Sequence, residues 1–166
     1  GSFTGLRIGS ATAKGLGLAL KKPLLAVPTV EALAYNLWGS SALICPIMDA
    51  RRSQVYTGLY YAEEELQTEK EPCAMDMHEL ISELNARGER TVFLGDGVPV
   101  YESLIRRELT VAYSFAPPQS SRQRAASVAA LGELYMKQGR MVTAADFKPE
   151  YLRKPQAERE REGIEL

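Results

Sequence analysis

The sequence has few of the residues from which most catalytic centres are built. Its 166 residues include one histidine, His78, and two cysteines, Cys45 and Cys73. Zinc sites usually need three or four histidine or cysteine ligands, so nothing here indicates a metal site. A serine or cysteine nucleophile with a histidine base would have to use His78, which we expect at the surface. We therefore expect no bound metal and no cofactor, and we expect the chain to be neither a zinc hydrolase nor a hydrolase with a serine or cysteine nucleophile.

Long apolar runs and an excess of charge are also missing. No apolar stretch approaches the roughly 18 residues of a membrane-spanning helix, and no secretory signal opens the chain. The formal net charge of −1 gives no strong field toward membranes or nucleic acid. The cysteines do not suggest a secreted disulfide framework, and we expect Cys45 to be a buried small hydrophobe. These features predict a cytoplasmic globular protein without membrane contact.

Glycine is abundant where a helix is predicted to begin the chain, over residues 4–20. Glycine inside a helix costs roughly 1 kcal/mol relative to alanine. Gly5, Gly9, Ala13 and Gly17 lie four residues apart and share one helix face. A face with almost no side chains indicates close approach of another element. That element is either the protein's own sheet or a partner, and the residues alone leave both open.

Strands alternate with helices along the rest of the chain. Residues 54–62 show the period of two that is typical of a strand, and they follow an apolar run over 42–49. This antiparallel pair, followed by β-α-β units, predicts an α/β fold with a mixed sheet. The predicted strands are 23–28, 42–49, 54–62, 66–72, 91–94 and 109–115; the predicted helices are 4–20, 29–38, 76–86, 99–107 and one that ends at Gly139.

Cap signals mark several of these helices. Asp76 with Glu79 three residues later is a capping-box pattern, and the helix that it opens is expected to stop at Gly88. Thr29 is a predicted N-cap, as is Ser120 or Ser121 for the last helix.

Four segments together resemble the TsaB (YeaZ) family. The resemblance covers most of the chain and implies an actin-like ATPase (RNase H-like) lobe with a mixed sheet flanked by helices. In that family further elements precede the first of these segments, so we expect the chain to lack the front of its first lobe. The segments are GSFTGLRIG with ATAKGLGLAL (1–20), MDARR leading into VY (48–56), LGDG (94–97) and PEYLR (149–153).

The same resemblance implies three parts. Residues 1–40 correspond to a remnant of the N-terminal lobe and residues 41–145 to the second lobe. Residues 146–166 correspond to a C-terminal segment with a charged tail.

Actin-like ATPases clasp phosphates between glycine-rich turns, and this chain keeps only part of that pattern. Asp49 remains in the predicted hairpin, but arginines, including Arg51, replace the glycines. The glycines before the first helix do not match a Walker motif. We expect at most a degenerate nucleotide or anion site, and Gly95–Gly97 has the simpler interpretation of a strand-to-helix turn. The residues of this degenerate site are Ser2, Thr4, Asp49, Arg51, Gly95, Asp96 and Gly97.

The resemblance also implies a function. TsaB is a non-catalytic partner of the catalytic subunit TsaD in making N6-threonylcarbamoyladenosine on ANN-decoding tRNA. We expect this chain to bind a TsaD-like subunit, with a small TsaE-like ATPase as a further partner, and to meet tRNA only indirectly. Without its partner it is expected to form a homodimer. The alternative is a stand-alone actin-like ATPase or a glycoprotease-type peptidase. The predicted partner-binding residues are Gly5, Arg7, Gly9, Ser10, Ala13, Lys14 and Gly17.

Overall fold

The structure, a computed structural model, describes residues 3–152. Ser2, Arg153 and the charged tail lie outside these residues. The chain divides into two compact units: residues 28–128 form the larger, and the segments before and after them form the smaller. No helix in the described part is long and apolar enough to cross a bilayer. The lobe boundaries expected at residues 40 and 145 stay predictions.

A five-stranded mixed sheet forms the larger unit, with strand order β4-β3-β2-β5-β6. The antiparallel strands β2 (Ser40–Asp49), β3 (Gln54–Ala62) and β4 (Gln67–Asp76) follow one another along the chain. Strands β5 (Thr91–Leu94) and β6 (Tyr113–Phe115) are both parallel to β2. The carboxyl ends of β2, β5 and β6 therefore meet at one edge of the sheet, which is where open α/β sheets bind ligands.

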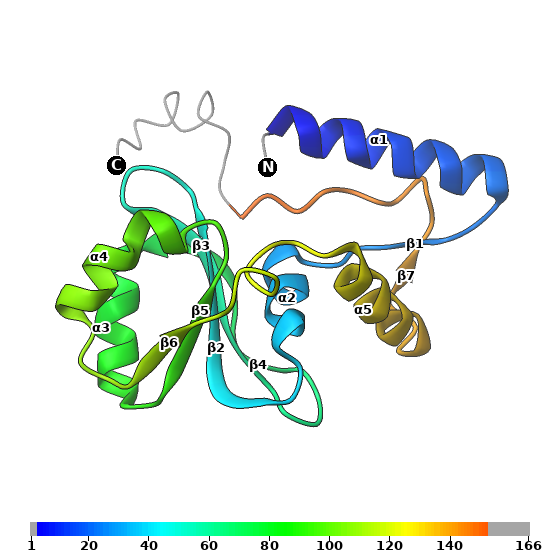
Figure 1. The fold of residues 1–166 in the computed structure, drawn as a ribbon. Coiled ribbons are helices and arrows are strands. Elements are labelled where there is room, and N and C mark those ends of the chain that lie inside the picture. The colour runs from blue at the N-terminus through cyan, green and yellow to red at the C-terminus, as the bar shows by residue number, and fades with distance from the viewer. Residues whose placement is uncertain (1–2, 153–166) are drawn as a thin grey trace. The chain divides into compact units, whose positions relative to one another are not determined.

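Helices cover both faces of this sheet (Figure 1). On one face lie α3 (Met77–Arg87) and α4 (Val98–Glu108); on the other lie α2 (Thr29–Ala34) and the short 3-10 helix η1 (Tyr35–Leu37). Strand β3 shows how the alternation builds two cores, because Leu59 packs in the cluster of α3 and α4 while Tyr60 packs in that of α2. Each fully buried large side chain contributes about 1.5–3 kcal/mol. The predicted α/β fold with a mixed sheet is confirmed.

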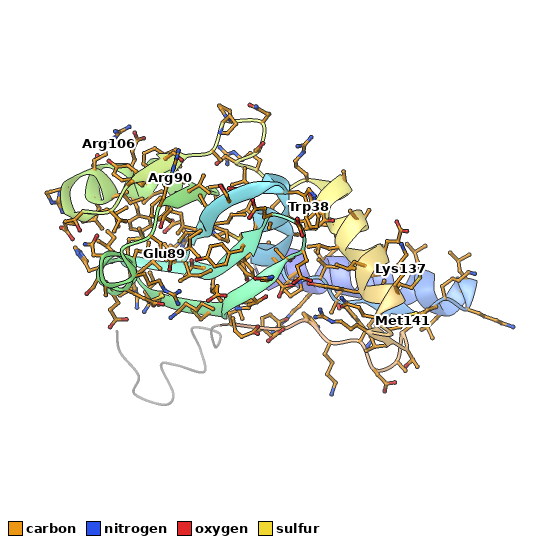
Figure 2. The ribbon with its side chains drawn as sticks, turned by 90° about the horizontal axis from the view of Figure 1, so that it is seen from below. Trp38, Glu89, Arg90, Arg106, Lys137 and Met141 are labelled. Atoms are coloured by element: carbon orange, nitrogen blue, oxygen red, sulfur yellow. The ribbon has the colours of Figure 1, made fainter. Side chains whose placement is uncertain are left out.

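The chain's single tryptophan, Trp38, follows η1 and is 49% exposed. Its ring lies 5.1 Å from that of Tyr35. Figure 2 shows it on the opposite side of the sheet from Arg106, which belongs to α4. Trp38 is therefore a single fluorescent reporter for the larger unit.

The smaller unit contains α1 (Phe3–Leu20) and a two-stranded sheet of β1 (Leu24–Leu25) and β7 (Met141–Val142). The last helix, α5 (Ala125–Lys137), crosses the boundary between the two units in the sequence. Its buried residues Leu131 and Tyr135 belong to the smaller unit, where the guanidinium of Arg140 lies 3.6 Å from the Tyr135 ring.

Two predicted caps are wrong. Helix α2 has Pro28 at its N-cap position and no side-chain cap, so Thr29 is already helical. Helix α5 begins only at Ala125 because Ser120 and Ser121 are held in a turn by hydrogen bonds to Pro117 and Pro118. At α3 the predicted cap is confirmed: the Asp76 carboxylate accepts a hydrogen bond of 2.8 Å from the His78 backbone N–H.

Two strands are shorter than predicted, and one was not predicted. The apolar run 109–115 yields only the three residues of β6, because Leu109 ends α4 and the Thr110 backbone N–H donates to Asn85 Oδ1. The run 23–28 narrows to β1 between two prolines, which have no N–H for a sheet. Strand β7 is only two residues long, too short for its alternation to be recognised.

Candidate functional site

Helix α1 exposes an apolar row along one face. Ile8, Leu16 and Leu20 form it, with Thr12 in the same series of four-residue intervals; all four are exposed, and the Thr12 hydroxyl donates to the Ile8 carbonyl at 2.9 Å. Gly9 lies beside this row, and a Cβ added to it would meet nothing within 4 Å. A surface helix normally turns such a stripe toward a core. Among the described residues of the smaller unit, no element covers this face of α1.

A different face of α1 packs on its own unit. Gly17 is buried, and a Cβ there would lie 3.1 Å from Leu24 and 3.2 Å from Ala144. Lys14 Nζ donates hydrogen bonds to the carbonyl oxygens of Ala145, at 3.3 Å, and Phe147, at 3.2 Å. The small-residue stripe is therefore only partly covered: Gly17 packs within the smaller unit, whereas Gly9 is exposed.

The predicted partner-binding residues lie on both faces. Gly5, Arg7 and Gly9 are exposed, whereas Ser10 and Ala13 are half-buried. Lys14 and Gly17 are engaged within the smaller unit, as described above. Sequence reasoning left Ile8 out of the site, although its spacing from Leu16 and Leu20 was visible in the sequence.

The second predicted site partly assembles, at the carboxyl edge of β2 and β5. The Asp96 carboxylate accepts a hydrogen bond of 3.3 Å from the Asp49 backbone N–H, and Asp49 Oδ1 accepts one of 2.9 Å from the Arg51 backbone N–H. Thr4 belongs to α1 in the other compact unit, and Ser2 lies outside the described residues.

Gly95 and Gly97 allow this turn to pack closely against the Ile47 carbonyl of β2. Gly97 N donates to the Ile47 carbonyl at 3.0 Å, and a Cβ on Gly97 would lie 2.9 Å from that oxygen. Gly95 has φ +112°, and its Cβ would collide with the same carbonyl. The turn thus rests on β2 through backbone contacts and connects β5 to α4, while a nucleotide or anion site at Gly95–Gly97 stays a prediction.

Sequence reasoning missed Tyr101 at this edge. Its hydroxyl donates to Asp49 Oδ1 and to the Gln54 carbonyl, each at 3.3 Å. Burial, with the nearby Asp49 carboxylate, raises the pKa of Tyr101. A buried tyrosine in the first turn of a predicted helix gives no sequence signal for this contact, which joins α4 to the β2–β3 turn.

The Cys45 thiol and the His78 ring each contact a polar side chain within the larger unit. Cys45 is fully buried, and its Sγ lies 3.7 Å from the Thr57 hydroxyl. Burial raises the pKa of its thiol to about 12, so Cys45 is unsuited to act as a nucleophile. The exposed His78 ring is 2.8 Å from the Glu108 carboxylate. Within residues 3–152 there is no group of three metal-ligating side chains.

An open hollow of about 630 Å³ lies at the opposite, amino end of β2. Its wall is mostly polar and acidic, and none of its residues belongs to the predicted sites. The lining residues are Ser40, Ser41, Tyr61, Glu63, Glu64, Glu65 and Gln67.

Known proteins match this chain along most of its length. The family model "TsaD: tRNA N6-adenosine threonylcarbamoyltransferase" matches residues 1–161. The tRNA threonylcarbamoyladenosine biosynthesis protein TsaB of Bacillus subtilis is 33% identical over 162 residues, which are 95% of this chain and 68% of that protein. The protein of the same name from Escherichia coli is 39% identical over 67 residues, covering 39% of this chain and 29% of that protein.

Solved structures agree on the fold. YeaZ from Pseudomonas aeruginosa superposes with a TM-score of 0.71 at 23% identity, over 91% of this chain and 70% of that one. A second Pseudomonas aeruginosa structure, described as similar to peptidase YEAZ, gives a TM-score of 0.69 at 22% identity, over 92% and 69%. The chain therefore belongs to the TsaB (YeaZ) family, within the group that the TsaD family model describes.

Proposed function

We propose that this chain is an accessory subunit in the formation of N6-threonylcarbamoyladenosine on tRNA. It would bind a TsaD-like catalytic subunit and hold that subunit in its active form. The observation that carries the proposal is the exposed row of α1 beside Gly9, in a chain that is 33% identical to a TsaB protein. A small TsaE-like ATPase would be a further member of the assembly.

The chemistry of the described residues supports an accessory role. The carboxylates of Asp49 and Asp96 accept hydrogen bonds from backbone N–H groups and from Tyr101 at a tightly packed turn. The glycines of that turn face the Ile47 carbonyl and not open space. A glycoprotease-type peptidase or a stand-alone ATPase gains no support from this arrangement.

We infer that the partner docks on the exposed face of α1. Ile8, Leu16 and Leu20 are 62%, 57% and 65% exposed, and apolar surface of that kind gains free energy when a partner covers it. The open space at Gly9 would let a partner backbone come close, as small residues allow at helix–helix contacts. In this proposal the predicted residues Gly5 and Gly9 would lie at the interface, and Lys14 and Gly17 would support α1 from its other face.

A matched pair of leucines tests this. Leu16 and Leu18 are 57% and 64% exposed but lie about 160° apart around the helix, given about 100° per residue. We expect Leu16→Glu to abolish co-elution with the TsaD-like subunit and Leu18→Glu to leave it intact. Threonylcarbamoyladenosine formation in a mixture with the other subunits should follow the same order. Equal binding by both variants would contradict the proposed face, and absence of binding by the unchanged chain would contradict the proposed function.

A further inference from the structure

Arginines in the larger unit occur in two different settings. Arg106 and Arg107 each form an ion pair with a glutamate, at 2.6 and 2.8 Å. Arg51, Arg122 and Arg124 are exposed and form no ion pair with any residue in the described range 3–152. An unpaired guanidinium keeps its fork of N–H donors available for an outside anion.

These three arginines belong to one edge of the sheet. Arg51 lies in the turn directly after β2, and the other two lie in the segment after β6. Because β2, β5 and β6 are parallel neighbours, their carboxyl ends fall on the same edge, with β2 and β6 about 10 Å apart. Gln123 joins this segment to the edge, since its amide nitrogen is 3.2 Å from the Thr29 carbonyl oxygen and 3.9 Å from Met48 Sδ.

The segment that carries Arg122 and Arg124 is held in place by its neighbours. The Asn36 amide nitrogen donates to the carbonyl oxygens of Ser120 and Arg122, each at 2.8 Å. Asn36 is fixed in turn by a hydrogen bond of 2.6 Å from the Ser127 hydroxyl. A backbone already ordered in this way lowers the entropy lost when a ligand binds.

Charge at this edge differs in sign from that of the whole chain. The aspartates at this edge are Asp49, Asp96 and Asp76, which ends β4 opposite Gln54, and each accepts a hydrogen bond from a backbone N–H group. Beside them stand Arg51, the neighbouring exposed Arg52, Arg122 and Arg124. These four arginines and three aspartates together carry a charge of +1, in a chain whose formal net charge is −1.

We propose that this surface, the arginine edge (Arg51, Arg122 and Arg124), contacts the phosphodiester backbone of tRNA. The inference rests on the proposed function, which brings tRNA to the assembly, and it replaces the expectation that the chain meets tRNA only indirectly. A guanidinium group can bind a phosphate through two parallel N–H···O hydrogen bonds. Positive charges that are spread over about 10 Å fit a polymer with repeated phosphates better than one small anion.

The test measures binding of an unmodified ANN-decoding tRNA transcript by fluorescence anisotropy, with this chain alone and with its complex with the TsaD-like subunit. The variant is Arg122→Gln with Arg124→Gln. Arg90→Gln is the control, because Arg90 is also exposed and unpaired among the described residues but precedes β5, at the other edge. We expect the double variant to bind severalfold more weakly and to lower the slope of log affinity against log salt by about 2. The control should bind as the unchanged chain does.

Unchanged affinity and salt slope in the double variant would overturn the inference, as would absence of tRNA binding both alone and in the complex. If the double variant loses the TsaD-like subunit but not tRNA, the edge faces an acidic protein surface, and the RNA assignment is wrong. The proposed function is judged separately, by whether the unchanged chain forms the complex and supports modification.

Discussion

At the scale of single residues, Gly95 has the most constrained backbone in the candidate nucleotide turn. Its φ of +112° disfavours any side chain, and an added Cβ would run into the Ile47 carbonyl. We expect Gly95→Ala to lower the free energy of unfolding by more than about 2 kcal/mol. Urea unfolding followed by the fluorescence of Trp38 measures this.

Gly88 provides the control for that substitution. It also has a positive φ, +73°, but an added Cβ would meet nothing within 4 Å. Gly88→Ala should therefore lower the free energy of unfolding by only about 1 kcal/mol, which is the cost of a left-handed backbone conformation for a residue with a Cβ. Equal losses in the two variants would show that the packing of Gly95 on β2 contributes nothing.

The thiols give a prediction about pH. Burial raises the pKa of Cys45 from 9.0 to about 12, against the lowering effect of its Thr57 hydrogen bond. Because the folded pKa is the higher one, the contribution of Cys45 to stability is complete below pH 9.0 and is lost as pH rises toward about 12. We expect Cys45→Ala to flatten the decline of unfolding free energy over that range.

The half-buried Cys73 is the natural comparison for that measurement. Burial raises the pKa of its thiol as well, but Cys73 is only partly covered. A thiol reagent at pH 8 should label Cys73 slowly in the folded chain and reach Cys45 only after unfolding. Rapid native labelling of Cys45 would contradict its burial.

At the scale of elements, the strands inside the sheet were the easiest to predict from the sequence. β3 and β5 were predicted with the bounds that the structure has, because their apolar residues pack on both faces of the sheet. The start of α5 was not predicted, because the preceding residues 120–124 are held by Asn36, Gly95 and Thr29, all distant in sequence. Local signals cannot reveal bonds of that range.

In the candidate sites, too, only the features that depend on neighbouring residues in the sequence could be predicted. The glycine spacing of α1 is a local signal and pointed to a special helix face. Which glycines are covered depends on Leu24 and on Ala144, the latter more than a hundred positions away, so the division between Gly9 and Gly17 was not predictable. The arginine edge was missed for the same reason, since only the strand order brings Arg51 and Arg122 to one edge.

Asn36 gives a prediction at this scale. Removing its amide in Asn36→Ala leaves two carbonyl oxygens without their donor, which we expect to cost about 2 kcal/mol. Hydrogen exchange should speed up in residues 119–124. Asn85→Ala is the matched control, because Asn85 also holds a loop backbone: its amide donates to the Glu108 carbonyl and accepts from the Thr110 backbone N–H. Unchanged exchange of residues 119–124 in Asn36→Ala would show that the arginine segment is not held by this side chain.

At the scale of the whole molecule, the exposed face of α1 predicts self-association when no partner is present. Leucines and isoleucine that are more than half exposed on one face favour a contact that removes them from water. We expect light scattering at high protein concentration to give the mass of a dimer. Leu16→Glu should restore the monomer, whereas Val100→Glu should not, because Val100 is equally exposed, at 57%, but lies on α4. A monomer from the unchanged chain would refute the prediction.

The central claim is that this chain is a partner subunit, and size-exclusion chromatography with light scattering tests it most directly. The chain would be mixed with the TsaD-like subunit of the same organism, and the fluorescence of Trp38 would verify that the chain is folded. We expect one peak whose mass is that of a defined complex, and we expect Leu16→Glu to lose this peak and Leu18→Glu to keep it. Separate elution of the two proteins, with the chain folded, would contradict it.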